Sequence, residues 1–117
     1  THTSIEFILI KGNHDIMDNK IYEDLNIVCH DYLVDGSFIF SHDKLEYDTD
    51  HFNIYGHIHP GVLLKAKARQ SSRFPCFYFN NVEAVLPAFG KFTGLHLMKV
   101  KEGDEVYIVY DDKVMKV

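Results

Sequence analysis

The chain has 117 residues, of which 46% are hydrophobic and 25% are charged. This composition excludes a disordered or fibrous protein, and the length predicts a single domain covering residues 1–117. A formal net charge of −5 also excludes a uniformly basic, nucleic-acid-binding surface.

The first predicted element is a strand, followed by a short helix. Residues Ile5–Ile10 are rich in β-branched and aromatic side chains and end at Lys11-Gly12, which is typical of a strand buried on both faces. Residues Asp18–Leu25 predict a short helix, capped by Asp18 or Asn19, with Ile21 and Leu25 one turn apart. We therefore expect a strand, a loop and a helix before the next strand.

Two further strands are predicted at Ser37–Phe40 and Phe52–Tyr55, and each is followed directly by a histidine-containing motif. Ligands of layered α/β structures bind outside the ends of the strands, where loops converge. The sequence therefore predicts one shared site at these strand ends.

The second half of the chain is predicted to be mostly β. A strand within Gly61–Arg69 alternates Lys65, Lys67 and Arg69 with small or apolar residues, which would place the three cations on one face. Further strands and one turn follow from apolar runs and from a Gly-containing polar segment: strands at Phe74–Phe79, Val82–Leu86, Gly94–Val100 and Glu105–Tyr110, and the turn at Lys101–Asp104.

The cations of this half form a local basic segment. No Asp or Glu occurs between His51 and Val82, and Lys65, Lys67, Arg69 and Arg73 give that window a balance of +4. One interpretation is that Lys65, Lys67 and Arg69 contact substrate phosphates. The other is that they protect an exposed strand, and the sequence leaves both interpretations open.

Three short motifs contain the candidate chemistry: Gly12-Asn13-His14-Asp15, Ser41-His42-Asp43 and Gly56-His57-Ile58-His59. Imidazole, carboxylate and amide oxygen are suitable ligands for divalent Mn, Fe, Zn or Mg. Gly56 and Pro60 predict a bent loop that directs His57 and His59 inward. The other histidines are interpreted as structural or surface residues: His2, His30, His51 and His96.

The three motifs, in this order, resemble the later signature motifs of the calcineurin-like metallophosphoesterases. The resemblance implies a layered α/β fold, the C-terminal part of a β-sandwich flanked by helices, with two divalent metal ions in the complete domain. It also implies roles for six residues: Asn13, His42 and His57 as ligands of one metal, His59 as a ligand of the other, His14 at the leaving group, and Asp15 orienting His14.

A second resemblance is narrower. Three segments are similar to the bacterial ligase-associated DNA-damage-response endonucleases called PdeM: Gly56–Gly61, Arg73–Phe77 and Leu86–Gly94. This similarity implies a phosphodiester substrate, with DNA favoured. The alternatives are hydrolysis of a small nucleotide diester and a noncatalytic interaction module that keeps the fold.

Two motifs of the resembled family, an Asp-x-His and a Gly-Asp that supplies the bridging carboxylate, do not occur before Gly12. We therefore expect this chain to be a C-terminal portion of such a domain, or a domain that needs a partner segment. It is expected to hold at most one partly formed metal site and to be weakly active or inactive alone. An exposed sheet edge would favour a homo-oligomer.

The remaining expectations concern location, thiols and aromatic residues. No apolar run approaches the roughly 18 residues that span a bilayer, and no secretion signal is evident, so no membrane association and a cytoplasmic location are expected. Cys29 and Cys76 are expected to be free, with Cys76 buried. The aromatic residues of Phe74–Phe79 are expected in the core rather than in a base-stacking surface.

Overall fold

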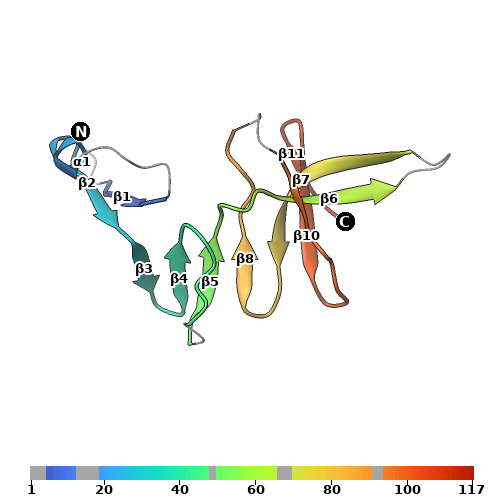
Figure 1. The fold of residues 1–117 in the computed structure, drawn as a ribbon, viewed down its shortest axis with the longest axis horizontal. Helices are drawn as coiled ribbons and strands as arrows, with labels where there is room; N and C mark the ends of the chain where they lie inside the picture. Colours follow the sequence, from blue (N-terminus) through green and yellow to red (C-terminus); the bar gives the residue numbers. More distant parts are fainter. Residues whose placement is uncertain (1–4, 13–18, 48–49, 66–69, 91–93) are drawn as a thin grey trace.

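The chain forms an elongated, β-rich structure of 55 × 32 × 30 Å (Figure 1). The computed structural model describes residues 5–12, 19–47, 50–65, 70–90 and 94–117. The helix is α1 (Asn19–Asp24), and the strands are β1 (Phe7–Ile10), β2 (Ile27–His30), β3 (Tyr32–Asp35), β4 (Phe38–Ser41), β5 (Phe52–Tyr55), β6 (Pro60–Lys65), β7 (Ser71–Phe79), β8 (Glu83–Val85), β9 (His96–Leu97), β10 (Glu105–Tyr110) and β11 (Lys113–Lys116).

The N-terminal unit is a two-stranded parallel sheet, β1 with β2, connected through α1. The predicted helix is present, and its Tyr22 is buried. The prediction that the first strand is buried on both faces is wrong, because Phe7 remains 60% exposed and Ile8 40% exposed. The faces of a strand are covered by elements that pack on the sheet, and the one helix of the described residues, α1, packs mainly against β2.

The second sheet has nine strands, and its main path follows the order β11-β10-β7-β8-β5-β4-β3. Strands β4, β5 and β8 run parallel to one another, whereas the pairs β3–β4, β7–β8, β7–β10 and β10–β11 are antiparallel. The carboxyl ends of β4, β5 and β8 therefore meet at one edge of the sheet, the upper edge in Figure 1. His42 and His57 follow the first two of these ends.

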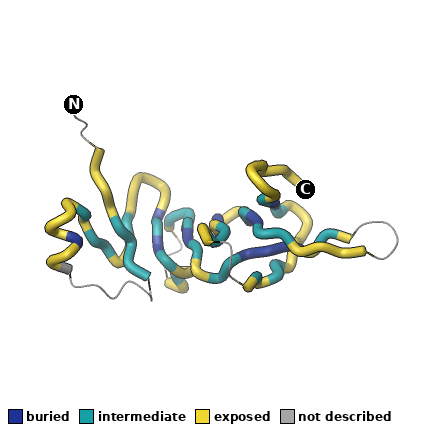
Figure 2. The backbone as a smooth tube through the Cα atoms, turned by 90° about the horizontal axis from the view of Figure 1, so that it is seen from above, coloured by how far each residue is buried: buried dark blue, intermediate teal, exposed yellow. Residues whose placement is uncertain are grey.

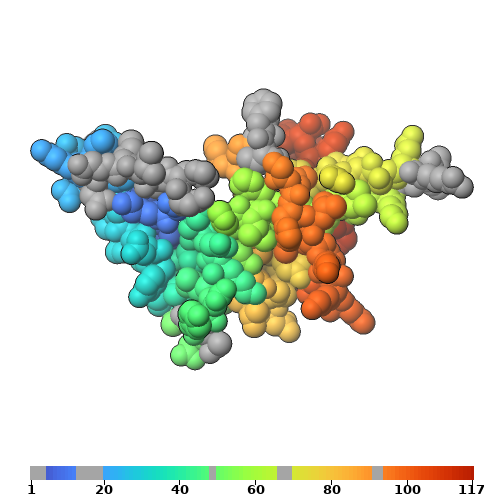
Figure 3. Space-filling view, viewed as in Figure 1, coloured from blue at the N-terminus to red at the C-terminus, as the bar shows by residue number. Residues whose placement is uncertain are grey.

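Strand β7 exchanges partners along its length. Its first part, through Pro75, pairs with β6, and its second part, from Cys76, pairs with β10. Proline has no backbone N–H to donate to a ladder, so it is tolerated where a strand changes its partner. As a result β6 and the start of β7 project from the body as a hairpin, at the end of the molecule opposite the N-terminal unit (Figures 1 and 3).

The core lies where β5, β6, β7, β8 and β10 meet. It consists of the buried side chains Tyr55, Val62, Cys76, Tyr78, Val85, Val106 and Ile108. Most of the buried stretches lie in the middle of the molecule (Figure 2). Buried and less buried residues alternate along β7 and β10, as expected for a sheet with one packed face. Cys76 is fully buried, and burial raises the pKa of its thiol to about 11, so the prediction of a buried structural thiol is confirmed.

The predicted layered α/β fold flanked by helices is wrong. The described residues contain one six-residue helix, and the structure is a small β-rich domain. Antiparallel strands need only short turns, so most connections of the second half place no helix over the sheet. Strands β2, β3 and β11 were not predicted. Of the predicted strand Gly94–Val100, only the two-residue β9 forms.

No helix within residues 5–12, 19–47, 50–65, 70–90 and 94–117 has the length and apolar character that crossing a membrane requires.

Candidate active site

The ends of β4 and β5 bring His42 and His57 together. His42 directly follows β4, and His57 follows β5 after Gly56. The backbone N–H of Gly56 donates to the carbonyl oxygen of His42 over 3.0 Å, which extends the parallel β4–β5 ladder by one hydrogen bond. The parallel pairing of β4 and β5 therefore places both imidazoles at the same end of the sheet.

The two imidazole rings are in direct contact. His42 Nε2 lies 2.9 Å from His57 Nδ1, so one of these nitrogens donates a proton and the other accepts it. The ring centroids are 4.7 Å apart, at an interplanar angle of 60°. His42 is half-buried and His57 is more exposed, so the pair lies at the surface with one ring anchored.

Gly12 of the first motif lies against the His42 ring. A Cβ atom at position 12 would be 2.6 Å from His42 Cε1 and from His42 Nδ1, closer than any stable contact. A glycine is therefore required for the segment after β1 to approach this ring. Asn13, His14 and Asp15, the predicted ligand and catalytic residues of the same motif, lie outside the described residues.

The loop after β5 is sharply bent, as predicted from Gly56 and Pro60. Ile58 N–H donates to Gly56 O over 2.8 Å, closing a three-residue turn in which His57 has a φ of 67°. His59 also has a positive φ, 54°, and its carbonyl oxygen accepts from the backbone N–H of His96. Left-handed conformations at non-glycine residues cost about 1–3 kcal/mol each and cluster at functional sites.

The His42–His57 pair fits part of a metal site. Two imidazole nitrogens that bind one ion at about 2.1 Å are roughly 3.0 Å apart at an octahedral right angle and roughly 3.4 Å apart at a tetrahedral angle, so the separation of 2.9 Å is closer to the octahedral case. His59 does not complete a ligand set, because among the described residues no group of three His, Cys, Asp or Glu side chains could hold a metal ion. The described residues thus supply two adjacent nitrogen ligands, from His42 and His57.

Asp43 faces the opposite nitrogen of His57. Its Oδ2 lies 3.9 Å from His57 Nε2. Asp43 directly follows His42 in the sequence, but its carboxylate lies beside His57. At 3.9 Å this contact is too long for a hydrogen bond, and both side chains are exposed.

Glu83 was not among the predicted residues, yet it links the segments that hold the histidines. Its carboxylate accepts hydrogen bonds from Tyr55 Oη at 2.6 Å and Asn80 Nδ2 at 2.7 Å, and lies 3.5 Å from Lys44 Nζ. Burial alone would raise the pKa of Glu83, but the hydrogen bonds from Tyr55 and Asn80 and the Lys44 ammonium outweigh burial and lower the pKa. Burial and the Glu83 carboxylate raise the pKa of Tyr55.

The basic segment lies on the projecting β6–β7 hairpin. Lys65 pairs with Ser71 and Leu63 pairs with Arg73, so Lys65 and Arg73 share one face of the hairpin, and both are exposed. Lys67 and Arg69 lie outside the described residues. In the sequence, Arg73 contributed only to the local positive charge. Because it shares an exposed face with Lys65 in the structure, it is a further candidate for phosphate contact.

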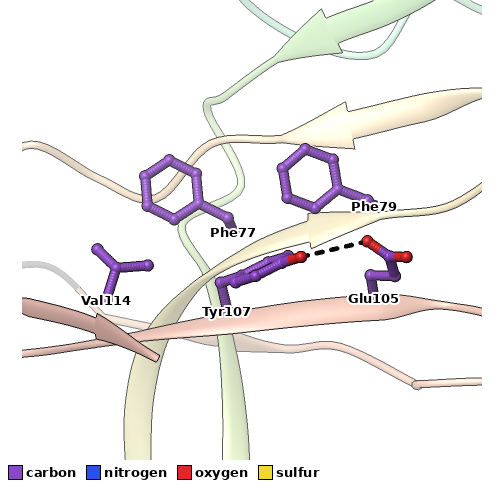
Figure 4. Close-up of a pocket in the computed structure, with 5 residues that line it drawn as sticks. All are labelled: Phe77, Phe79, Glu105, Tyr107 and Val114. Atoms are coloured by element: carbon purple, nitrogen blue, oxygen red, sulfur yellow. Dashed lines mark hydrogen bonds between the residues drawn. The ribbon is translucent and has the colours of Figure 1, made fainter. Parts of the chain in front are cut away.

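A shallow pocket of 420 Å³ lies on the outer face of β7, β10 and β11 (Figure 4). Its lining consists of Phe77, Phe79, Glu105, Tyr107 and Val114. Cys76 and Tyr78 point into the core from the other face of β7, so the prediction that the aromatic run is core holds for one face and not for the other. The pocket contains a single carboxylate and no imidazole, so it offers no metal chemistry.

No protein-family model matches the chain. No curated protein matches it either. Among solved structures, the nuclease MPE of Pseudomonas putida is similar, with a TM-score of 0.70, 26% sequence identity, and coverage of 94% of this chain and 53% of that chain. The chain therefore has a nuclease-like fold and spans about half the length of that nuclease chain.

Proposed function

We propose that the chain is part of a metal-dependent phosphodiesterase of the calcineurin-like class that cleaves nucleic acid, of the ligase-associated endonuclease type. The observation that supports this most directly is the 2.9 Å contact between His42 and His57, two imidazoles delivered by neighbouring parallel strands. The likeness to a nuclease at 26% identity is a second, independent support.

In this proposal His42 and His57, together with Asn13, hold one divalent ion, and His59 contributes to a second. Both imidazoles must present an unprotonated nitrogen to the ion that they share. A bound Mn²⁺, Fe²⁺, Zn²⁺ or Mg²⁺ would polarise the phosphate and lower the pKa of bound water.

His14 and Asp15 have the remaining chemical roles in the proposal. His14 would donate a proton to the departing oxygen, and the Asp15 carboxylate would orient that imidazole. His14→Ala is then expected to lower turnover more than it lowers metal content. An equal loss of both would make His14 a ligand.

The basic hairpin supports a polynucleotide substrate. Lys65 and Arg73 lie on an exposed face that contains no acidic residue, beyond His59 along β6. At about 3.3 Å per residue, Lys65 is roughly 20 Å along the strand from His59. That distance is more than a small nucleotide spans, so cations there would contact phosphates several nucleotides from the scissile bond.

Metal binding and hydrolysis together test the proposal on the 117-residue chain. We expect calorimetry with MnCl₂ to show one bound ion per chain, with affinity at least tenfold weaker in His57→Ala. His51→Ala is the matched control, because His51 precedes β5 and lies at the end of the strand opposite His57. Wild-type protein that binds no divalent ion would disprove the metal site.

Hydrolysis separates the alternatives. We expect Mn²⁺-dependent cleavage of a single-stranded oligonucleotide that EDTA abolishes and His57→Ala removes. Cleavage of bis(p-nitrophenyl) phosphate without cleavage of DNA would indicate a small-diester enzyme instead. Bound Mn²⁺ with no cleavage of either substrate, even in a longer protein that includes the Asp-x-His and Gly-Asp motifs, would favour a noncatalytic module.

A further inference from the structure

Asn53 is a buried polar residue within an otherwise apolar strand. It is the second residue of β5, between Phe52 and Ile54, and only 6% of it is exposed. Burying a carboxamide without hydrogen-bond partners is strongly unfavourable in an apolar environment. The hydrogen-bond partners of Asn53 therefore indicate which part of the structure its buried carboxamide holds in place.

Those partners lie on both sides of His42. Asn53 Nδ2 donates to the carbonyl oxygen of Ile39 at 3.1 Å and to Ser41 Oγ at 2.9 Å. Asn53 Oδ1 accepts from the backbone N–H of Leu45 at 3.0 Å. One side chain thus connects the last residues of β4 to the loop that follows His42.

Ser41 extends this connection. Its hydroxyl accepts from Asn53 and donates to the carbonyl oxygen of Asp43 over 2.6 Å. The residues immediately before and after His42 are therefore joined to each other and to β5. Ser41 is itself only 8% exposed, so water competes little for these bonds.

We infer that Asn53 is a positioning residue, whose carboxamide, acting with Ser41, holds the segment from Ile39 to Leu45 so that His42 Nε2 meets His57 Nδ1. The hydrogen bonds of Asn53 go to Ile39, Ser41 and Leu45, so it acts through the segment that supports His42. The role requires two N–H donors and one acceptor in a side chain of this size. Aspartate has the same shape but no N–H, so its carboxylate would face the Ile39 carbonyl and the Ser41 oxygen.

The test follows the ring contact itself, in metal-free protein. In wild type we expect a nuclear Overhauser effect between the His42 and His57 rings, and nitrogen shifts in which one of the facing nitrogens is protonated. Folded Asn53→Asp is expected to lose both signals. Tyr78→Phe is the control, since it removes a different buried hydrogen bond, from Tyr78 Oη to Asp104.

Two results would overturn the inference: absence of the ring contact in wild type, or its survival in folded Asn53→Asp. If Asn53→Asp does not fold, Ser41→Ala decides, because it removes only the bond to the Asp43 carbonyl and the acceptor for Asn53. An unchanged ring contact in Ser41→Ala would then reject the role. These measurements need no metal.

A second readout depends on the proposed function. If His42 and His57 are ligands, Asn53→Asp is expected to weaken Mn²⁺ binding by about 10–100-fold, the usual effect of removing support from a ligand. Tyr78→Phe should leave that affinity unchanged. Wild-type protein that binds no Mn²⁺ would reject the metal site. The positioning role of Asn53 would still be tested by the contact between the His42 and His57 rings.

Discussion

His42 Nε2 and His57 Nδ1 are 2.9 Å apart although 15 residues separate them in the chain. The register of β4 against β5 produces this contact: Phe40 pairs with Ile54, and the next bond of the ladder joins Gly56 N to His42 O. A shift of one residue in this register would turn the side chains to the other face of the sheet. The histidine pair therefore depends on the packing of two short strands.

The close approach of Gly12 to His42 gives the first prediction. Gly12→Ala would place a methyl group 2.6 Å from the His42 ring, so the ring or the segment after β1 must move. We expect a loss of about 1–3 kcal/mol of stability, which is typical of overpacking, and a weaker His42–His57 contact. Thermal unfolding and the ring-to-ring nuclear Overhauser effect measure the two effects.

Gly90→Ala is the matched control. A Cβ atom at position 90 would meet no atom within 4 Å, so this variant should keep wild-type stability and ring contact. If Gly12→Ala and Gly90→Ala have the same stability and the same ring contact, the close approach of Gly12 to the His42 ring affects neither property.

The network around Glu83 predicts a dependence of stability on pH. The hydrogen bonds and Lys44 lower the pKa of Glu83 below its ordinary value of 4.5, so the unfolded chain takes up a proton first as the pH falls. The contribution of Glu83 is therefore complete above about pH 5 and declines as the pH falls through 4.5 and then through the lower folded-state pKa. Urea unfolding across this range measures the decline.

Glu83→Gln should make the acid dependence shallower and cost about 1–3 kcal/mol near neutral pH, because an amide replaces one of two accepting oxygens. Part of the dependence should persist. Tyr78 and the Lys101 N–H hydrogen-bond Asp104 and also lower its pKa. An acid profile identical to that of wild type would show that Glu83 contributes nothing to it.

The sequence predicted the local elements around the site better than the architecture. Phe52–Tyr55 and Glu105–Tyr110 form strands with the predicted bounds, because turn residues bracket each apolar run. The layered fold with flanking helices was inferred from family resemblance, and the short antiparallel connections contradict it. All four residues of the strand at Lys113–Lys116 are exposed, and its sequence, Lys-Val-Met-Lys, has no alternation of apolar and polar residues to indicate a strand.

The site was only partly predictable. Histidine motifs that follow neighbouring strands indicated that His42 and His57 would lie close together. The spacing of residues in the sequence did not indicate that Asn53 supports the His42 segment or that Asp43 lies beside His57. Asn53 gave one signal, a polar residue inside an apolar strand. Glu83 gave none, because its partners, Lys44 and Tyr55, come from distant positions and meet it only after the sheet forms.

The two thiols should differ in reactivity. Cys76 has no exposed surface, and its pKa of about 11 keeps it protonated near neutral pH, whereas Cys29 is half-buried at β2. We expect a disulfide-exchange reagent to modify one thiol per folded chain, and the second only on unfolding. Rapid modification of both thiols would contradict the core packing around β7.

The last prediction tests whether the β6–β7 hairpin contacts a nucleic-acid backbone. Arg73→Ala should weaken binding to a single-stranded oligonucleotide and reduce the steepness of its salt dependence by about one ion, because each neutralised phosphate releases roughly 0.7–0.9 of a counterion. Lys113→Ala is the control, since Lys113 is also an exposed cation but lies on the edge strand β11, which β10 separates from β7. If Lys113→Ala lowers the salt dependence as much as Arg73→Ala does, the binding reflects net charge alone. In that case the cations of the hairpin serve to protect its exposed strands from pairing with another chain.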